Sequence, residues 1–519
     1  MRAGLARLLG WTACLCAALL PSSAARAQRG TAGPIYQPNI DALVEGGEEW
    51  LARLEQQGWF LRGQFTGIVQ AHPSFHSPYR GASSLSPKDE TRDTQSVDLV
   101  LGRRLWRNAE VVAVPSLTRG FGLSNSVGVA SFPNGEAFRL GTRDPSLWLS
   151  RLFVRQTIDL SAETDLGTDP DPMRFTGPLA RERITLTAGR VSAWDFFDDN
   201  RYAHDARSQF MGWGLVGTGA FDFAADARGF TDGAVAEWEN GRWAVRSGAF
   251  RVARDANSLD LEPRWLKGWQ VLTQVERAWS IGPHAGMVRL LGGLSRTRSA
   301  RWDALTGAVQ ANETDIDPLR SFRTKRMLAL NLEQELTDEL GGFARLGWND
   351  GRAQNWMFTE MDWSVSAGLS LAGLRWHRQQ DTIGLAFNAG GLSDPHRRFL
   401  AAGGIGFITG DGRLNYRPEL TTEAYYDMRL APGLHLAANA QAGGEPGLAM
   451  PIAARSRCWR CGCTPPSEAR GRFRPASSPA VNAAAGSIGA HSFTRIPPAC
   501  ASRPLPCAAA SCCCCSASA

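Results

Sequence analysis

Residues 61–70 read LRGQFTGIVQ, and this stretch decides the fold class because apolar and polar side chains alternate along it. On an extended chain, Leu61, Phe65 and Val69 fall on one face. The opposite face carries the polar side chains of Arg62, Gln64, Thr66 and Gln70. A period of two residues is the pattern of a β-strand whose two faces meet different surroundings. The stretch therefore predicts a strand with one apolar and one polar face.

The same alternation recurs between residues 59 and 441. Three further segments set apolar against polar residues: Val97, Leu99 and Leu101 against Ser96 and Asp98; Trp148, Leu152, Val154 and Ile158 against Arg151, Arg155 and Thr157; and Ile383, Leu385 and Phe387 against Thr382, Gly384 and Asn388. A soluble sandwich would bury the apolar faces in a core, whereas a membrane barrel turns them to lipid and lines its lumen with the polar faces. Alternation by itself leaves both architectures open.

Turn residues between the segments indicate antiparallel neighbours. Residues 239–242 read Glu-Asn-Gly-Arg, which is the Asn-Gly signal of a tight hairpin. Residues 281–283 and 431–433 read Ile-Gly-Pro and Ala-Pro-Gly, and they indicate further short connections. The longer stretch at residues 72–93, rich in turn-forming residues, is typical of an extracellular loop.

The first 27 residues have the three parts of a secretory signal peptide. Arg2 and Arg7 supply the charged start, residues 8–20 contain the apolar run, and Ala-Arg-Ala at residues 25–27 offers a cleavage site before Gln28. A membrane anchor is the alternative, but the apolar run is too short to span ~30 Å of hydrocarbon. We therefore expect export through the general secretory pathway.

Composition favours the barrel over the soluble sandwich. After the signal, no apolar run is long enough for a transmembrane helix, and the chain is rich in Gly (55), Phe (23) and Trp (18). Trp59, Trp148, Trp243 and Trp269 lie near segment ends, where the aromatic girdles of a barrel sit. Residues 28–457 contain no cysteine, which suits passage through an oxidising periplasm. The net charge of +6 gives no case for nucleic-acid binding.

The exported chain divides into three parts by its patterning. Residues 28–58 form a periplasmic segment, and helical spacing of its apolar residues predicts a short amphipathic helix over residues 40–57. Residues 59–441 form the barrel. Residues 442–519 are rich in Ala, Pro, Ser, Arg and Cys and show no periodicity.

Several motifs of the barrel region are specific enough to compare with known families. Residues 197–205 read FDDNRYAHD and residues 219–226 read GAFDFAAD. Residues 59–66, 132–137 and 347–351 read WFLRGQFT, FPNGEA and GWNDG. These motifs resemble those of the OprB-type carbohydrate-selective porins, and the similarity runs from about residue 59 to about residue 441. The resemblance implies an all-β transmembrane antiparallel barrel of about 16 strands in a Gram-negative outer membrane. It also implies passive uptake of glucose or related sugars.

A sugar pore needs polar groups that replace the water around sugar hydroxyls yet bind weakly enough to release the solute. Arg151 and Arg155 lie four residues apart on one strand, so both face the lumen if Trp148 and Leu152 face lipid. The other candidates for lining the pore are Arg62, Gln64, Asn331, Glu333 and Glu335. The resemblance implies a constriction lined by arginines, but it does not identify which arginines of this sequence form it. These charges can equally be general lumen residues that pair with one another.

The sequence carries no motif of an enzyme, a metal site or a cofactor site. His72 and His76 are separated by Pro73, which disfavours a helical metal pair. An outer-membrane barrel enzyme would need a Ser-His-Asp group, and none of the 8 histidines sits in such a frame. A general porin, or one selective for anions or phosphate, stays open because lumen arginines suit it too. The expected partners are small neutral sugars, outer-membrane lipid and the barrel-assembly machinery, with no nucleic acid.

The tail at residues 442–519 reads as a translation in the wrong frame. A barrel ends with a strand that pairs with its first one, because an open edge cannot stand in lipid. Read from the third base of the Met450 codon, GC-rich codons give a turn and then an apolar, strand-like run that resembles the family's closing segment. Codons for Cys and Trp begin with T. In the shifted frame this T becomes the second base of a codon, and every codon with T at its second position encodes an apolar residue. We therefore expect that the closing strand is lost and that the tail is disordered.

Overall fold

The computed structural model describes residues 47–461, apart from residues 78–80, 138–140, 166–170, 413, 415, 432 and 445–449. The predicted signal peptide at residues 1–27, the start of the predicted periplasmic segment and residues 462–519 lie outside the described residues. Within the described part, none of the helices combines the length and the apolar character of a membrane-crossing helix.

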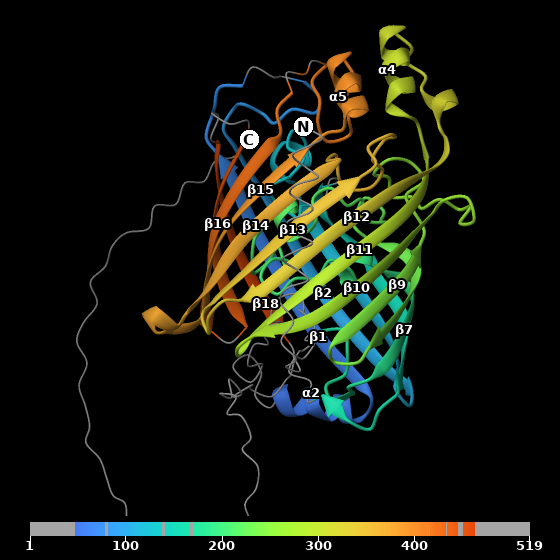
Figure 1. Ribbon diagram of the computed structural model, residues 1–519. Helices are drawn as coiled ribbons and strands as arrows, with labels where there is room; N and C mark the ends of the chain where they lie inside the picture. The colour runs from blue at the N-terminus through green and yellow to red at the C-terminus, as the bar shows by residue number, and fades with distance from the viewer. Residues whose placement is uncertain are drawn as a thin grey trace, which may run out of the picture. The chain divides into compact units, whose positions relative to one another are not determined.

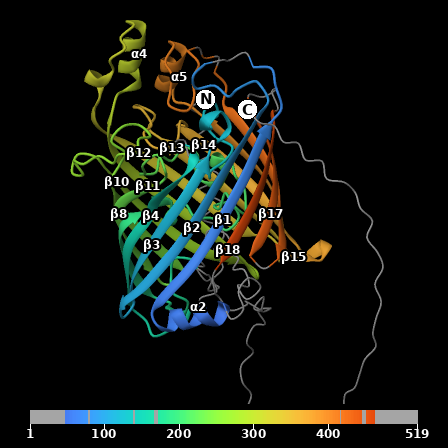
Figure 2. The same ribbon diagram turned by 180° about the vertical axis from the view of Figure 1, so that it is seen from behind.

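Sixteen antiparallel strands form a single barrel (Figures 1 and 2). They are β1 (Trp59–His72), β2 (Glu90–Trp106), β3 (Ala109–Gly120), β4 (Thr142–Asp159), β7 (Arg183–Val191), β8 (Thr231–Glu239), β9 (Trp243–Phe250), β10 (Trp269–Ile281), β11 (His284–Ser299), β12 (Ser321–Glu335), β13 (Leu340–Asn349), β14 (Trp363–Gly373), β15 (Arg378–Gly391), β16 (Glu419–Ala431), β17 (Leu434–Gly444) and β18 (Met450–Cys461). Strands that are consecutive in this list are hydrogen-bonded neighbours in the barrel. The remaining two strands, β5 (Thr164–Asp165) and β6 (Leu179–Ala180), pair in a separate two-stranded ribbon. The predicted all-β barrel is confirmed.

The two ends of the barrel differ in the length of their connections. At one end, the turn end, short turns join most neighbouring strands, a longer connection at residues 160–182 joins β4 to β7, and α2 (Gly47–Gln56) lies close to them (Figure 1). The predicted Asn-Gly hairpin is one of these turns: Asn240 accepts hydrogen bonds from the backbone of Trp243, and Gly241 has a φ of +81° that favours glycine. At the other end, the loop end, long connections carry α4 (Trp302–Gln310) and α5 (Asp394–Ala401) (Figure 1).

Side chains alternate along the strands as predicted. Val97 and Leu385 are exposed on the outer wall, whereas Ser96 and Asn388 on the same strands are buried on the lumen side. The apolar core lies inside the barrel, where loops from the loop end fold inward. One cluster of buried residues joins Phe197, Trp213 and Phe221 of the connection at residues 192–230, which contains α3 (Trp213–Val216), to Trp356 of the next inward loop.

Two carboxylates of β16 attach these inward loops to the wall. Glu423 on β16 accepts hydrogen bonds from the backbone N–H groups of Met211 (2.7 Å) and Gly212 (2.9 Å). Glu419 on the same strand accepts hydrogen bonds from the backbone of residues 130 and 131, at 2.8 and 2.7 Å. Each carboxylate supplies acceptors for N–H groups that lie away from water and would otherwise be unsatisfied. The loops therefore have defined positions inside the lumen.

A bulge between β3 and β4 changes which side chains face the lumen. Val114 pairs with Arg151 and Pro115 pairs with Leu149, so Ser150 is an extra residue on β4. Proline cannot donate a ladder hydrogen bond and is tolerated in sheets at such irregular positions. The expectation that Trp148 faces lipid was therefore wrong: its indole donates a hydrogen bond to the lumen residue Thr118 (3.1 Å).

The pairing of strands continues past residue 441. The backbone of β18 pairs with β17 on one side and with β1 on the other, which completes the barrel. We expected the family's own closing strand to be lost, and residues 450–461 of the tail occupy its position in the barrel. This pairing satisfies backbone N–H and C=O groups of β1 and β17 that an open edge would present to lipid.

Candidate functional site

A cavity of about 260 Å³ lies in the lumen between β2, β3 and β4 and the inward loops. It is slightly smaller than the range of about 300–1,000 Å³ typical of small-molecule pockets. The charged side chains that line it are Asp98, Glu136, Arg151, Asp195, Asp205, Arg207 and Arg228, and the aromatic ones include Trp148, Trp194, Trp213 and Phe230. The bulge at Ser150 brings both Trp148 and Arg151 into this lining.

Arg151 is held in a fixed plane by Asp195. Its Nε and Nη2 donate to the two carboxylate oxygens at 2.7 and 2.6 Å, and its Cζ lies 4.9 Å from the centre of the Phe230 ring. Asp195 ends a short 3₁₀ helix at residues 193–195, whose first turn is closed by the reciprocal side-chain contacts of Ser192 and Asp195. A bidentate pair of this kind orients the guanidinium without using all of its donors.

A second ion-pair group lies across the cavity around Arg207. The Arg207 guanidinium lies 3.1 Å from the Asp98 carboxylate and 3.0 Å from the Glu136 carboxylate. One strand of the wall, β2, and the connection between β3 and β4 therefore both contact this guanidinium. Burial raises the pKa of the Glu136 carboxyl above its ordinary value, and the charge of Arg207 opposes this rise. The group presents both donors and acceptors to the cavity.

Aromatic rings separate these charged groups. Trp148 and Phe230 meet edge to face with ring centres 5.0 Å apart, and Trp194 and Trp213 do the same at 4.9 Å. Arg228 lies over the Trp148 ring, with Cζ 4.8 Å from its centre. Within the described ranges, no ion pair joins Arg228 to a carboxylate. Flat apolar rings beside planar donors can pack against the C–H face of a sugar and hydrogen-bond its hydroxyls.

Of the seven residues predicted from the sequence to line the pore, only Arg151 lines this cavity. Arg62 and Arg155 lie nearer the turn end and hold the connection between β4 and β7. Arg62 donates to the carbonyl of Asp171 (2.9 Å), and Arg155 donates to Glu110 (2.8 Å) and to the carbonyl of residue 173 (2.9 Å). Gln64, on the same strand as Arg62, donates to the hydroxyl of residue 66 at 3.1 Å.

The three candidates on β12 support an inward loop rather than the cavity. Asn331 donates to the Asp198 carboxylate (2.8 Å), and Glu333 accepts from Arg289 (3.0 Å) and from the backbone N–H of residue 201 (2.8 Å). Glu335 lies at the turn end, where its ligand atoms and those of His284 and residue 338 lie within 4.8 Å of one another. Asn331 and Glu333 therefore pair with other residues of the barrel and its inward loop.

Sequence reasoning missed most of the cavity. Trp148 was assigned to the wrong face, and Asp98, Glu136, Arg207 and Arg228 were not proposed for the pore. Two of the motifs quoted above gave a usable signal, because Glu136 belongs to FPNGEA and Asp205 belongs to FDDNRYAHD. How the loops fold into the lumen decides that both carboxylates line one cavity.

Comparison with known proteins decides the family. The sequence profile of the carbohydrate-selective porin, OprB family, matches residues 82–448, which is more than half of the chain. The chain belongs to the OprB family of carbohydrate-selective porins. It is therefore a channel of the outer membrane, and the predicted recognition and function are confirmed. Porins have short periplasmic turns and longer extracellular loops, so the turn end faces the periplasm and the loop end faces outward.

A solved structure of Pseudomonas putida OprB shares this fold. The high-pH structure of Pseudomonas putida OprB is 15% identical, with a TM-score of 0.61, and the match covers 83% of this chain and 100% of that one. The low-pH structure of the same OprB is 12% identical with a TM-score of 0.45, covering 83% and 99%. The outer membrane channel DcaP of Acinetobacter baumannii is 9% identical with a TM-score of 0.44, covering 78% and 98%. A search of curated protein sequences finds no match.

Proposed function

We propose that this OprB-family porin passes small neutral sugars such as glucose and selects them in the lumen cavity. The observation that carries the proposal is the placement of Arg151, which Asp195 fixes in plane beside Phe230. A fixed guanidinium beside an aromatic ring offers a sugar both hydrogen bonds and an apolar surface without demanding an ionised solute. Weak binding of this kind permits both entry and release.

The charge balance of the cavity supports a neutral solute over an anion. Four carboxylates, Asp98, Glu136, Asp195 and Asp205, line it together with three guanidinium groups, those of Arg151, Arg207 and Arg228. A pore built to select anions or phosphate would need an excess of positive charge at its narrow part. The anion-selective alternative is therefore less well supported than the sugar pore.

Export and assembly follow from the same proposal. Residues 1–27 would direct the chain through the general secretory pathway, and the barrel-assembly machinery would insert it into outer-membrane lipid. The family and the fold are those of a channel, and we propose no catalytic activity and no cofactor.

The permeation of solutes through the folded porin, measured in liposomes and planar bilayers, tests the proposal. Liposomes that contain the porin should swell in glucose faster than in a larger oligosaccharide, and glucose should reduce single-channel current in planar bilayers. Reversal potentials in a salt gradient should show weak selectivity between ions. Liposomes that stay impermeable to glucose, or strong anion selectivity with no glucose block, would refute the proposal.

A further inference from the structure

The outer wall of the barrel is apolar along much of its height and becomes basic near the loop end. On β11, the outward residues Leu290 and Leu294 are exposed, and the next outward positions are Arg296 and Arg298. On β12, Arg326 lies one outward step beyond the exposed Leu328. A change from apolar to basic side chains marks the level at which hydrocarbon gives way to lipid headgroups.

Strand register brings these cations together. Arg326 pairs with Leu294, and Arg296 pairs with Trp269 at the start of β10. The loop before β10 adds two exposed cations, and the Cζ of one of them, Arg264, lies 5.1 Å from the centre of the Phe322 ring on β12. The cluster, named the basic outer patch, consists of Arg264, Lys267, Arg296, Arg298 and Arg326.

Only two of the five cations are neutralised by carboxylates. Arg264 pairs with Glu262 (2.6 Å), and Arg298 donates to both oxygens of Asp317, whose pKa it lowers. Lys267, Arg296 and Arg326 have no carboxylate partner in the part of the chain that the structure describes. At the edge of the patch, Asp350 accepts a hydrogen bond from the backbone N–H of Arg326 (3.1 Å). The patch thus keeps three unneutralised cations.

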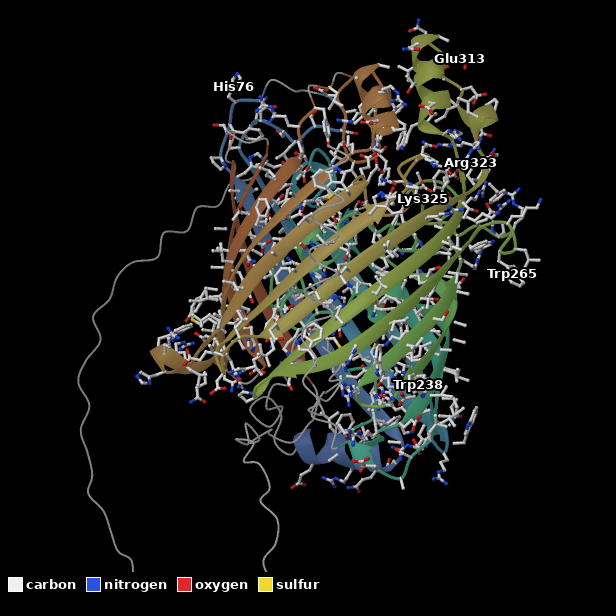
Figure 3. All side chains as sticks on the ribbon, in the orientation of Figure 1. His76, Trp238, Trp265, Glu313, Arg323 and Lys325 are labelled. Atoms are coloured by element: carbon white, nitrogen blue, oxygen red, sulfur yellow. The ribbon has the colours of Figure 1, made fainter. Side chains whose placement is uncertain are left out.

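Large apolar side chains accompany the cations. Trp265 and Leu266, in the same loop as Lys267, are 64% and 73% exposed. Figure 3 shows Trp265 projecting from the barrel at the loop end, on the same side as Arg323. Aromatic and basic residues in one band are typical of a lipid interface, where the rings lie at the boundary between acyl chains and headgroups.

We propose that the basic outer patch binds a glycolipid of the outer leaflet that carries several phosphates. Arginine and lysine bind phosphate oxygens by charge-assisted hydrogen bonds, and the spread of cations over two strands and a loop fits several phosphates better than the single phosphate of a phospholipid. A second copy of the chain is a poor occupant, because two identical patches of one sign repel each other.

Binding to purified lipids tests the proposal. The folded porin in detergent is titrated with bisphosphorylated lipid A, monophosphorylated lipid A, phosphatidylglycerol and phosphatidylcholine, and bound lipid is counted by native mass spectrometry. We expect the order of affinity to follow the number of phosphates, with bisphosphorylated lipid A first. In the triple variant Lys267→Gln, Arg296→Gln, Arg326→Gln, its dissociation constant should rise by about tenfold or more.

A matched triple variant controls for net charge. Arg107, Arg242 and Arg375 are exposed at the turn end, and their replacement by Gln removes the same charge from the opposite membrane surface. This control should bind lipid A like the parent, and all three proteins should conduct equally, which verifies that they are folded. Equal lipid A affinity of the parent and the patch variant would overturn the proposal. Equal affinity for phosphatidylglycerol and bisphosphorylated lipid A would also overturn it, because the patch would then recognise any anionic headgroup.

Discussion

The guanidinium of Arg151 and the carboxylate of Asp195 form a two-bonded planar pair, with donor–acceptor distances of 2.7 and 2.6 Å, in the wall of the lumen cavity. The pair joins the barrel strand β4 to a short helix of the inward connection at residues 192–230. It therefore fixes both the orientation of a solute-facing donor and the position of the loop that narrows the pore.

Replacing Arg151 by Ala should widen the pore and weaken sugar binding. We expect a higher single-channel conductance and a loss of about tenfold in glucose block, comparable to the loss of one charge-assisted hydrogen bond of about 1.5 kcal/mol. Arg155→Ala on the same strand is the matched control, because Arg155 is buried against Glu110 outside the cavity. Equal effects of the two variants on glucose block in planar bilayers would place the narrow part of the pore elsewhere.

Trp148→Leu should also weaken glucose block, because the bulge at Ser150 turns this ring into the cavity. The expected loss is about threefold to tenfold, which corresponds to about 0.5–1.5 kcal/mol for a ring contact. Trp243→Leu serves as the control, since Trp243 is exposed on the outer wall. If only the Trp243 variant altered the block, the assigned faces of the two rings would be wrong.

Glu423→Ala should loosen the inward loop without changing the barrel wall. The change leaves the backbone N–H groups of Met211 and Gly212 without their acceptor, at a cost of about 2–4 kcal/mol. We expect a lower unfolding temperature in detergent and noisier single-channel current. Glu423→Gln retains one carbonyl acceptor and should show a smaller effect. A parental unfolding temperature for the Ala variant would contradict the anchoring role.

The stability of the loop end should fall in strong acid because of Asp362. Its burial by itself would raise the pKa, but the charge and hydrogen bond of His396 outweigh this and lower the pKa to about 2. A depressed pKa stabilises the fold fully above the unfolded value of about 3.9, and the stabilisation, of about 2–3 kcal/mol, is lost as pH falls through about 2. Unfolding temperatures of the parent and Asp362→Asn should differ at pH 6 and converge near pH 2. A constant difference would exclude this titration.

The absence of strand-like periodicity in the sequence of residues 442–519 motivates the proposal that the tail is translated in the wrong frame. Residues 455 and 457 pair in register with Val69 and Gly67 of β1. We therefore expect that resequencing the gene between the codons for Leu436 and Met450 reveals a frame change. We also expect that the restored strand raises the yield of inserted porin. An unchanged in-frame sequence whose product inserts fully would contradict this proposal.

Local pattern was enough to predict the class of fold. Alternation around residues 61–70 assigned the outer and inner faces of β1 correctly, and the Asn-Gly pair at residues 240–241 located a hairpin. Both depend on neighbours along the chain, because the period of a strand and the φ of a turn are local properties. The family motifs extended this to a barrel of about 16 strands.

The sequence by itself thus determined the class of fold, the faces of β1, the Asn-Gly hairpin and the porin family, whereas the tertiary structure alone decided the site. Arg151 and Arg155 have the same residue type and nearly the same surroundings in sequence, yet a one-residue bulge and a loop from residues 192–230 put only Arg151 in the cavity. The position of an inward loop depends on contacts such as that of Glu423 with Met211, which are 212 residues apart. Such contacts depend on strand register and loop packing across the whole barrel, and no local period encodes them.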